Sequence, residues 1–258
     1  MVGMVKWGLG VGLLTLAGVL SQNGPAQSEE ASLAVAANFT EVIEVLVADF
    51  EGSSDHELTI VTGSTGQLYS QIANGAPFDI FLAADQERPE RLEAEGGAVE
   101  GTRFTYAIGR ITLWSPDPAA IGDDGGDYLA NGSFRALAMA NPDLAPYGVA
   151  ARETLQALDL WDAMKGRIVL GENIGQTHAM VATGNAEAGF VALSYVLSPE
   201  NDQPGSRWDV PGDLYSPIRQ DAVLVARGRD NTAARAFLDY MRSDAAHETI
   251  RAYGYDVD

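Results

Sequence analysis

Four short loops carry the residues whose types and spacing could do chemistry. Each loop follows an apolar, strand-like run and opens a helical pattern. Their central residues are Ala37-Asn38, Ser64-Thr65, Pro146-Tyr147 and Asn173-Ile174. A helix N-terminus presents unpaired backbone N–H groups and about half a positive charge, so four converging ends would attract an anion. The side-chain amide and hydroxyls on these loops could add neutral hydrogen-bond donors.

Each of these loops also has a plainer interpretation. Asn38 followed by Glu41 three positions later is typical of a capping box, and Asn is among the best capping residues. The stretch TGSTG at 62–66 lacks the lysine of a phosphate-binding P-loop and the G-x-S-x-G of a hydrolase, so a plain glycine-rich loop stays open. Tyr147 could simply pack on the surface. The residues alone indicate a two-lobed binding protein for a small ligand, with an anion as one candidate.

Strand-like runs alternate with helical patterns along the chain, which is typical of an α/β fold. Strands are expected at 33–37, 57–61, 78–85, 135–140, 188–197 and 221–226, and in the run RIVLG before Asn173. Apolar residues at the spacing of one helix face run from Phe39 to Phe50. Turn signals at Asn74-Gly75 and Gly184-Asn185 end two later helices. Ligands of such folds lie at the carboxyl ends of the strands, where the four loops are.

Two lobes are expected, each built from segments that need not be contiguous. Lobe I would comprise residues 29–107 and 219–258, and lobe II residues 108–218. The chain would cross between them near 104–109 and return near 215–219.

Composition narrows the class of protein. Residues 1–28 are typical of a cleaved secretory signal, with Lys6 before an apolar run and small residues near Ala26. The chain has no cysteine, which excludes disulfides, thiolate metal sites, cysteine nucleophiles and lipid attachment through cysteine. A formal net charge of −20 makes nucleic acid and anionic membranes poor partners. We therefore expect an exported, periplasmic protein, with a monomer as the default state.

Five segments in order resemble the periplasmic molybdate-binding proteins of ABC-type uptake systems: VAANFTEVIEVL, TGSTGQLYSQIANGAPFDIFLAADQE, ANPDLAPYGVAARETLQAL, GENIGQ and RAYGY. The resemblance covers nearly all of the chain after the signal, and QIANGAPFDIFLAAD is its most specific piece. It implies a type II periplasmic binding fold, with two lobes of mixed, mostly parallel sheets and a hinge that the chain crosses twice. The lobes would close on molybdate or tungstate, and an ABC permease of the inner membrane would accept the anion. The resemblance implies no cofactor, no direct coordination of a metal by side chains and no bond-breaking step.

The resemblance also assigns the site residue by residue. The family's first-loop ligand, usually a serine, falls on Asn38, where the backbone N–H of Ala37 or Asn38 itself could help. The second-loop serine falls on Ser64 or Thr65, and the register between the two stays open. Backbone N–H groups of the third and fourth loops fall on Tyr147 and Ile174.

One position departs from the family pattern. Many members carry a further tyrosine in the strand after the fourth loop, but Ala192 stands there in this chain. We therefore expect the hydroxyl of Tyr147 to supply the missing donor from the opposite loop.

Two rival interpretations remain. The same fold could bind sulfate, a phosphonate or a small organic anion. A secreted hydrolase using Ser64, or a metal-dependent one, would need a base or ligand set, and the histidines His56, His178 and His247 form no H-x-x-x-H or H-E-x-x-H pair. Among them only His178 is near a candidate loop, four residues after Ile174, where it is expected to be structural.

Overall fold

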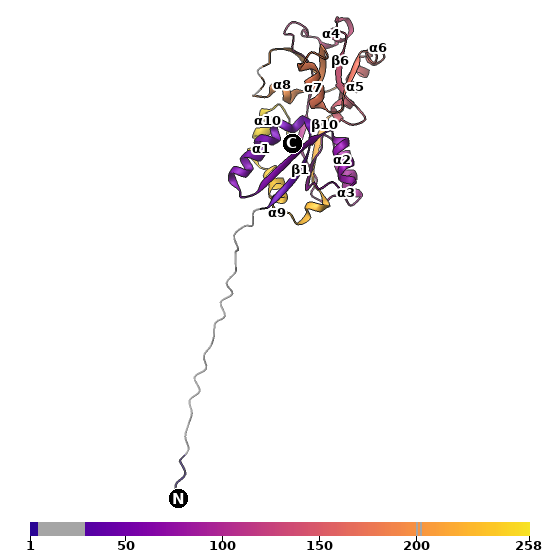
Figure 1. The fold of residues 1–258 in the computed structure, drawn as a ribbon. Helices are drawn as coiled ribbons and strands as arrows, with labels where there is room; N and C mark the ends of the chain where they lie inside the picture. Colours follow the sequence, from indigo (N-terminus) through magenta and orange to yellow (C-terminus); the bar gives the residue numbers. More distant parts are fainter. Residues whose placement is uncertain (5–28, 200, 202) are drawn as a thin grey trace.

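The computed structural model describes residues 1–4, 29–199, 201 and 203–258. Apart from residues 1–4, the expected secretory signal lies outside the described residues. Two α/β bodies stand one above the other in Figure 1, each built around one five-stranded sheet. In the described part of the chain, no helix combines the length and apolar character needed to span a membrane.

The first sheet contains the first and the last strand of the described fold and has the strand order β2-β1-β3-β10-β4. Its strands are β1 (Glu30–Ala36), β2 (Glu57–Gly63), β3 (Ile80–Leu82), β4 (Phe104–Gly109) and β10 (Ile218–Leu224). Strand β1 is parallel to β2 and β3, whereas β10 is antiparallel to β3 and β4. We call this sheet and its helices lobe I.

Helices cover both faces of the lobe I sheet. They are α1 (Thr40–Ser53), α2 (Thr65–Ala73), α3 (Glu87–Ala94), α9 (Thr232–Tyr240) and α10 (Asp244–Ala252), together with the short 3₁₀ helices η1 (Ala37–Phe39) and η2 (Ala226–Asp230). Leu33 and Val35 of β1 join the core under α1, α9 and α10, while Ala34 between them joins the core under α2 and α3. This alternation follows from the two-residue period of a strand.

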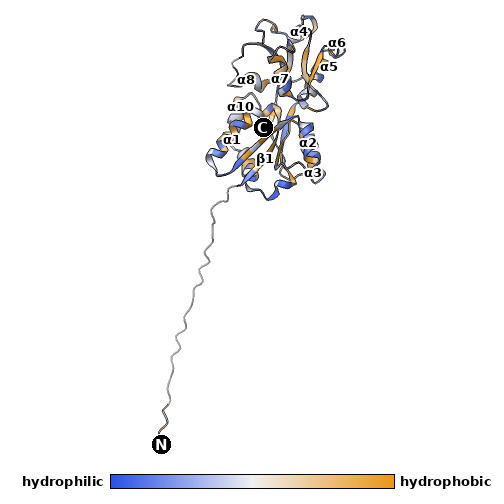
Figure 2. Ribbon diagram, viewed as in Figure 1, coloured by the Kyte–Doolittle hydropathy of each residue, from blue (hydrophilic) through white to orange (hydrophobic). Residues whose placement is uncertain are grey.

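The second sheet has the order β7-β6-β8-β5-β9, and with its helices it forms lobe II. Its strands are β5 (Ile111–Ser115), β6 (Leu137–Ala140), β7 (Ile168–Gly171), β8 (Ala188–Ala192) and β9 (Ser206–Asp209). The helices are α4 (Gly125–Asn131), α5 (Pro146–Ala157), α6 (Trp161–Met164), α7 (Ile174–Ala182) and α8 (Leu193–Leu197). Figure 2 shows hydrophilic residues along the outer helices and apolar residues toward the sheets, as the burial of both faces of each sheet requires.

Most expected elements are present near their predicted positions. The apolar face of α1 is buried through Val42, Leu46 and Phe50. Gly75 and Gly184, which follow α2 and α7, have φ angles of +85° and +75°. Glycine adopts this left-handed conformation at little cost, so both turn predictions are confirmed.

Three expectations about the elements need correction. The strand predicted at 188–197 ends at Ala192, and Leu193–Leu197 form helix α8. Strand β4 extends to Gly109, which pairs with Ile218 of β10, so the chain leaves the first sheet after Gly109 and returns at Ile218. The sheets are mixed as expected, but parallel and antiparallel pairings are equal in number. The reason is that β5 and β10, the strands that follow the two crossings between the lobes, run antiparallel to their neighbours.

Candidate functional site

Four helix N-termini meet at one small cavity between the lobes. The first turns of η1 and α2 approach from lobe I, and those of α5 and α7 approach from lobe II. All six predicted site residues line this cavity, together with six others. The lining residues are Ala36, Ala37, Asn38, Gly63, Ser64, Thr65, Ala84, Ala145, Pro146, Tyr147, Asn173 and Ile174. The cavity is small, with a volume of about 10 Å³ in this arrangement of the lobes, which suits a compact ligand rather than an extended one.

No lining residue carries a formal charge. The only electrostatic attraction that the cavity wall offers is therefore the partial positive charge of the four helix ends. Such a wall favours an anion whose charge is shared over several oxygen atoms, each able to accept hydrogen bonds from neutral N–H and O–H groups.

Ser64 and Thr65 lie at the N-terminus of α2 with 2% and 1% of their surface exposed. The Ser64 hydroxyl oxygen caps the helix by accepting from the backbone N–H of Gln67 at 3.3 Å. The Thr65 hydroxyl oxygen accepts from the backbone N–H of Ala84 at 3.1 Å. Because a hydroxyl can donate its own proton while it accepts, both residues remain able to donate to a ligand.

Asn38 does not cap a helix, so the capping-box expectation is wrong. It is the middle residue of η1, and neither η1 nor α1 has a side-chain cap. Its amide nitrogen instead donates to the Gln220 side-chain oxygen at 2.8 Å and to the Tyr255 hydroxyl at 3.0 Å. The Tyr147 hydroxyl is a third acceptor, 3.3 Å from the same nitrogen, so the protein's own groups use both amide protons and the backbone N–H is the donor that Asn38 can offer to the cavity.

Tyr147 follows Pro146 in the first turn of α5, where the backbone N–H has no partner within the helix. Its hydroxyl points to the hinge, 3.3 Å from the Asn38 amide nitrogen and 3.3 Å from the Gln220 amide nitrogen. A Cβ atom at Gly109, where the chain crosses between the lobes, would be 2.1 Å from that hydroxyl. The hydroxyl is therefore part of the protein's own hydrogen-bond network, contrary to the expectation that it would replace the donor missing at Ala192.

This buried network joins side chains from both lobes. Tyr106 and Gln220 are hydrogen-bonded at 3.1 Å, and Gln220 in turn contacts Asn38 and Tyr147. Burial raises the pKa of Tyr147 well above its ordinary value and raises the pKa of Tyr255 to about 12. Both hydroxyls therefore stay protonated near neutral pH, and the Tyr255 hydroxyl donates to the carbonyl of Asn38.

Hydrogen bonds join the two lobes directly at the edge of the cleft. The backbone N–H of Gly66 in α2 donates to the carbonyl of Leu144 at 2.9 Å. The Gln67 amide reaches the Glu172 carboxylate at 3.4 Å, and the Arg88 guanidinium lies 3.5 Å from the Asp143 carbonyl. The structure thus represents the closed arrangement of the two lobes.

Several lining residues were not predicted from the sequence. Asn173 was expected in the fourth loop but was given no role there; it caps α7 by accepting from the Gln176 N–H at 2.9 Å. Ala84 follows β3 and was detectable as the end of the FDIFLAAD run. Ala192 does not line the cavity, and neither does any histidine. A base for a Ser64 nucleophile is therefore not among the lining residues.

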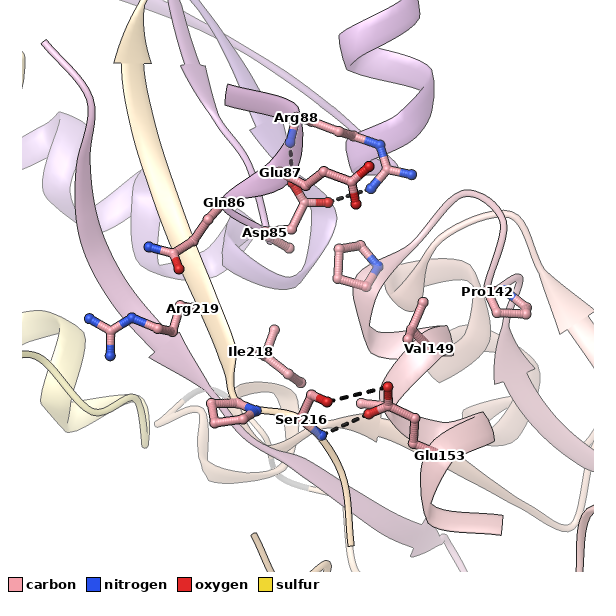
Figure 3. Close-up of a pocket in the computed structure, with 14 residues that line it drawn as sticks. Asp85, Gln86, Glu87, Arg88, Pro142, Val149, Glu153, Ser216, Ile218 and Arg219 are labelled. Carbon is pink, nitrogen blue, oxygen red and sulfur yellow. Dashed lines mark hydrogen bonds and ion pairs between the residues drawn. The ribbon is translucent and has the colours of Figure 1, made fainter. Parts of the chain in front are cut away.

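A second, larger cavity opens beside the first, with a volume of about 370 Å³ (Figure 3). It shares Ala84 and Pro146 with the small cavity and is lined by charged residues from both lobes. Several of these charges are already engaged, since Arg88 pairs with Asp85, and the Glu153 carboxylate accepts from the Ser216 N–H at 2.7 Å. In the described residues, no group of three His, Asp or Glu side chains could hold a metal ion.

Comparison with known proteins adds independent findings. Residues 31–256 match the family of the bacterial extracellular solute-binding protein. The chain is 51% identical over 249 residues to the molybdate-binding protein ModA of Azotobacter vinelandii, covering 96% of this chain and 95% of that protein. It is 45% identical over 247 residues to ModA of Rhodobacter capsulatus, covering 96% of each. The solved periplasmic molybdate-binding protein of Azotobacter vinelandii superimposes with a TM-score of 0.85 at 38% identity, covering 88% of this chain and 99% of that one.

Proposed function

This chain belongs to the bacterial extracellular solute-binding protein family, and we propose that it captures molybdate, and tungstate with it, for delivery to an ABC permease of the inner membrane. The observation that carries the proposal is the closed cavity at four helix N-termini, lined entirely by uncharged residues. The relatives that are 51% and 45% identical are both molybdate-binding proteins by name. Proteins of this family bind solutes and are not enzymes, so the proposed cycle has no bond-breaking step.

The proposed ligand set consists of backbone N–H and hydroxyl groups. The first loop would offer the N–H of Ala37 or Asn38, and the second the hydroxyl of Ser64 or Thr65. The third and fourth loops would offer the N–H groups of Tyr147 and Ile174, which lie in the first turns of α5 and α7. In this set Asn38 and Tyr147 act through the backbone, because their side chains are bonded to Gln220.

Neutral donors are sufficient for tight binding. A hydrogen bond to a charged group contributes about 1.5–3 kcal/mol. Roughly four to eight such bonds would therefore reach the approximately −12 kcal/mol of nanomolar affinity, before the cost of closure is subtracted. Selectivity against sulfate would come from size, because a smaller anion cannot reach all of the fixed donors at once.

The lobes would move as the two bodies that open and close around the anion. We assign residues 29–107 and 219–258 to lobe I and residues 108–218 to lobe II, and the pairing of Gly109 with Ile218 supports crossings close to these bounds. The permease would recognise the closed form, which the anion stabilises by bridging both lobes. We further propose export to the periplasm through residues 1–28, and a monomer, since both lobes must reach the permease.

Equilibrium dialysis against a panel of anions tests this function. Retention of molybdate and tungstate at micromolar concentrations, without retention of sulfate, phosphate or a phosphonate, is the expected result. Retention of sulfate or phosphonate alone would assign the same cleft to a different anion. Incubation with chromogenic esters provides the check on hydrolysis, and no product is expected.

A further inference from the structure

We propose that Tyr195 is a positioning residue for the anion site, because its hydroxyl holds the Ala37–Asn38 peptide group and fastens lobe II to lobe I around the ligand. This inference rests on the function proposed above. Tyr195 lies in α8 of lobe II, and its hydroxyl donates to the backbone carbonyl of Ala37 in η1 of lobe I. Neither Tyr195 nor Ala192, the last residue of the strand before it, lines the cavity.

The hydrogen bond from Tyr195 acts on the peptide group whose N–H would bind the anion. The carbonyl of Ala37 and the N–H of Asn38 belong to one planar trans peptide group, in which they point in opposite directions. A donor on the carbonyl side therefore fixes the direction of the Asn38 N–H, away from Tyr195. The Thr40 hydroxyl also donates to this carbonyl, at 2.8 Å. Hydrogen bonds to a carbonyl also polarise the peptide group and strengthen its N–H as a donor.

The next peptide group is held in the same way. The carbonyl of Asn38 accepts from the Ser194 hydroxyl at 3.1 Å and from the Tyr255 hydroxyl at 2.6 Å. Ser194 comes from lobe II, next to Tyr195, whereas Tyr255 belongs to the C-terminal segment that packs in lobe I. Two adjacent residues of α8 thus bond to two adjacent carbonyls across the cleft, so opening the lobes must break both bonds.

Packing fixes the Tyr195 ring. The ring is stacked on His178 with centroids 4.9 Å apart and planes 10° apart, and His178 in turn contacts Trp114 at 5.1 Å. Gly175, in the first turn of α7, lies beside the hydroxyl, since a Cβ atom there would be 3.0 Å from it. Tyr195 has 8% of its surface exposed, and the rings that hold it in place, His178 and Trp114, both belong to lobe II.

If Tyr195 both orients the Ala37–Asn38 peptide group and joins the two lobes, its hydroxyl should affect how long the anion stays bound. Because the bond between Tyr195 and Ala37 forms only on closure, removing the hydroxyl should shorten the life of the closed complex without slowing the encounter with the anion. Tyr195→Phe keeps the ring and its stacking on His178. We expect its molybdate dissociation rate to rise about tenfold while its association rate stays within twofold of the parent.

Stopped-flow fluorescence with molybdate measures both rates, using the intrinsic tryptophans. Ser194→Ala is a second variant, with an expected rise in dissociation rate of about threefold. Tyr69→Phe is the matched control, because the Tyr69 hydroxyl bonds to Glu95 at 2.8 Å within lobe I and Tyr69 does not line the cavity; its rates should not change. Melting temperatures without ligand show whether each variant is folded.

The outcomes separate this inference from the proposed function. Parent protein that binds molybdate, with Tyr195→Phe folded and unchanged in dissociation rate, would overturn the positioning role and leave the function intact. A slower association rate with an unchanged dissociation rate would overturn it as well. A parent protein that binds no molybdate would contradict the proposed function and the inference together.

Discussion

Ser64 caps helix α2 and also lines the cavity. Its hydroxyl accepts from the Gln67 N–H as the helix cap, and the hydroxyl proton remains available to the anion. Ser64→Ala should lower molybdate affinity at least tenfold, because a bond to a charged ligand contributes about 1.5–3 kcal/mol. It should also lower the free energy of unfolding by roughly 1 kcal/mol through loss of the cap. Calorimetric titration and urea denaturation measure the two effects.

Ser243→Ala is the control for the cap alone. Ser243 caps α10 by accepting from the Ala246 N–H at 3.2 Å and does not line the cavity. It should lose about the same stability as Ser64→Ala and keep the affinity of the parent. If Ser64→Ala also kept that affinity and Thr65→Val lost it, Thr65 would be the second-loop ligand.

A second residue-scale prediction concerns His178. Burial lowers its pKa, so the unfolded chain binds a proton more readily than the folded one. Its contribution to stability is therefore present above the unfolded pKa of about 6.5 and is lost as the pH falls below it. His178→Phe, which keeps a ring against Tyr195, should lose less stability than the parent between pH 7 and pH 5 in urea titrations. Parallel losses in the two proteins would contradict this.

Helix starts are the elements that make the site, and the first turn of α5 depends on a glycine. A Cβ atom at Gly148 would be 2.2 Å from the Ala140 carbonyl and 2.8 Å from the backbone nitrogen of Pro142. Gly148→Ala should therefore displace the N-terminus of α5, and with it the Tyr147 N–H. We expect more than a tenfold loss of molybdate affinity and about 1–3 kcal/mol of destabilisation from overpacking.

Gly166 provides the matched substitution for this helix prediction. A Cβ atom there meets nothing within 4 Å, so Gly166→Ala should leave affinity unchanged. Equal molybdate affinities of the Gly148 and Gly166 variants would show that anion binding does not depend on the position of α5.

The limits of prediction also follow from the elements. Alternating strand and helix patterns placed all four site loops, because a buried strand followed by an amphipathic helix is a local signal. The directions of Asn38 and Tyr147 were not predictable, because Gln220 and Tyr255, which bind them, are far away in the sequence. The role of Tyr195 was not predictable for a similar reason. The apolar run 188–197 resembles a single strand in the sequence. The helix that begins after Ala192 makes its contacts with the other lobe, and such contacts leave no local sequence pattern.

For the whole molecule, the net charge of −20 opposes the approach of an anion that the cavity itself attracts. Salt screens this long-range repulsion, with a Debye length of about 10 Å at 0.1 M, but affects the buried short-range bonds much less. We therefore expect the association rate of molybdate to rise with ionic strength, and the dissociation rate to change little. Stopped-flow measurements from 10 to 300 mM sodium chloride, roughly spanning long to short Debye lengths, test this. An association rate that is flat or falls with salt would refute the electrostatic argument.

Titration calorimetry of the chain without residues 1–28 tests the central claim most directly, with molybdate, tungstate, sulfate and phosphate as titrants. The cavity of uncharged donors predicts submicromolar binding of molybdate and tungstate at one site per chain, and no heat of binding with sulfate or phosphate. Binding of sulfate or phosphate as tight as that of molybdate, or no binding of any of the four, would contradict the claim that this cleft is built for a tetrahedral metal oxyanion.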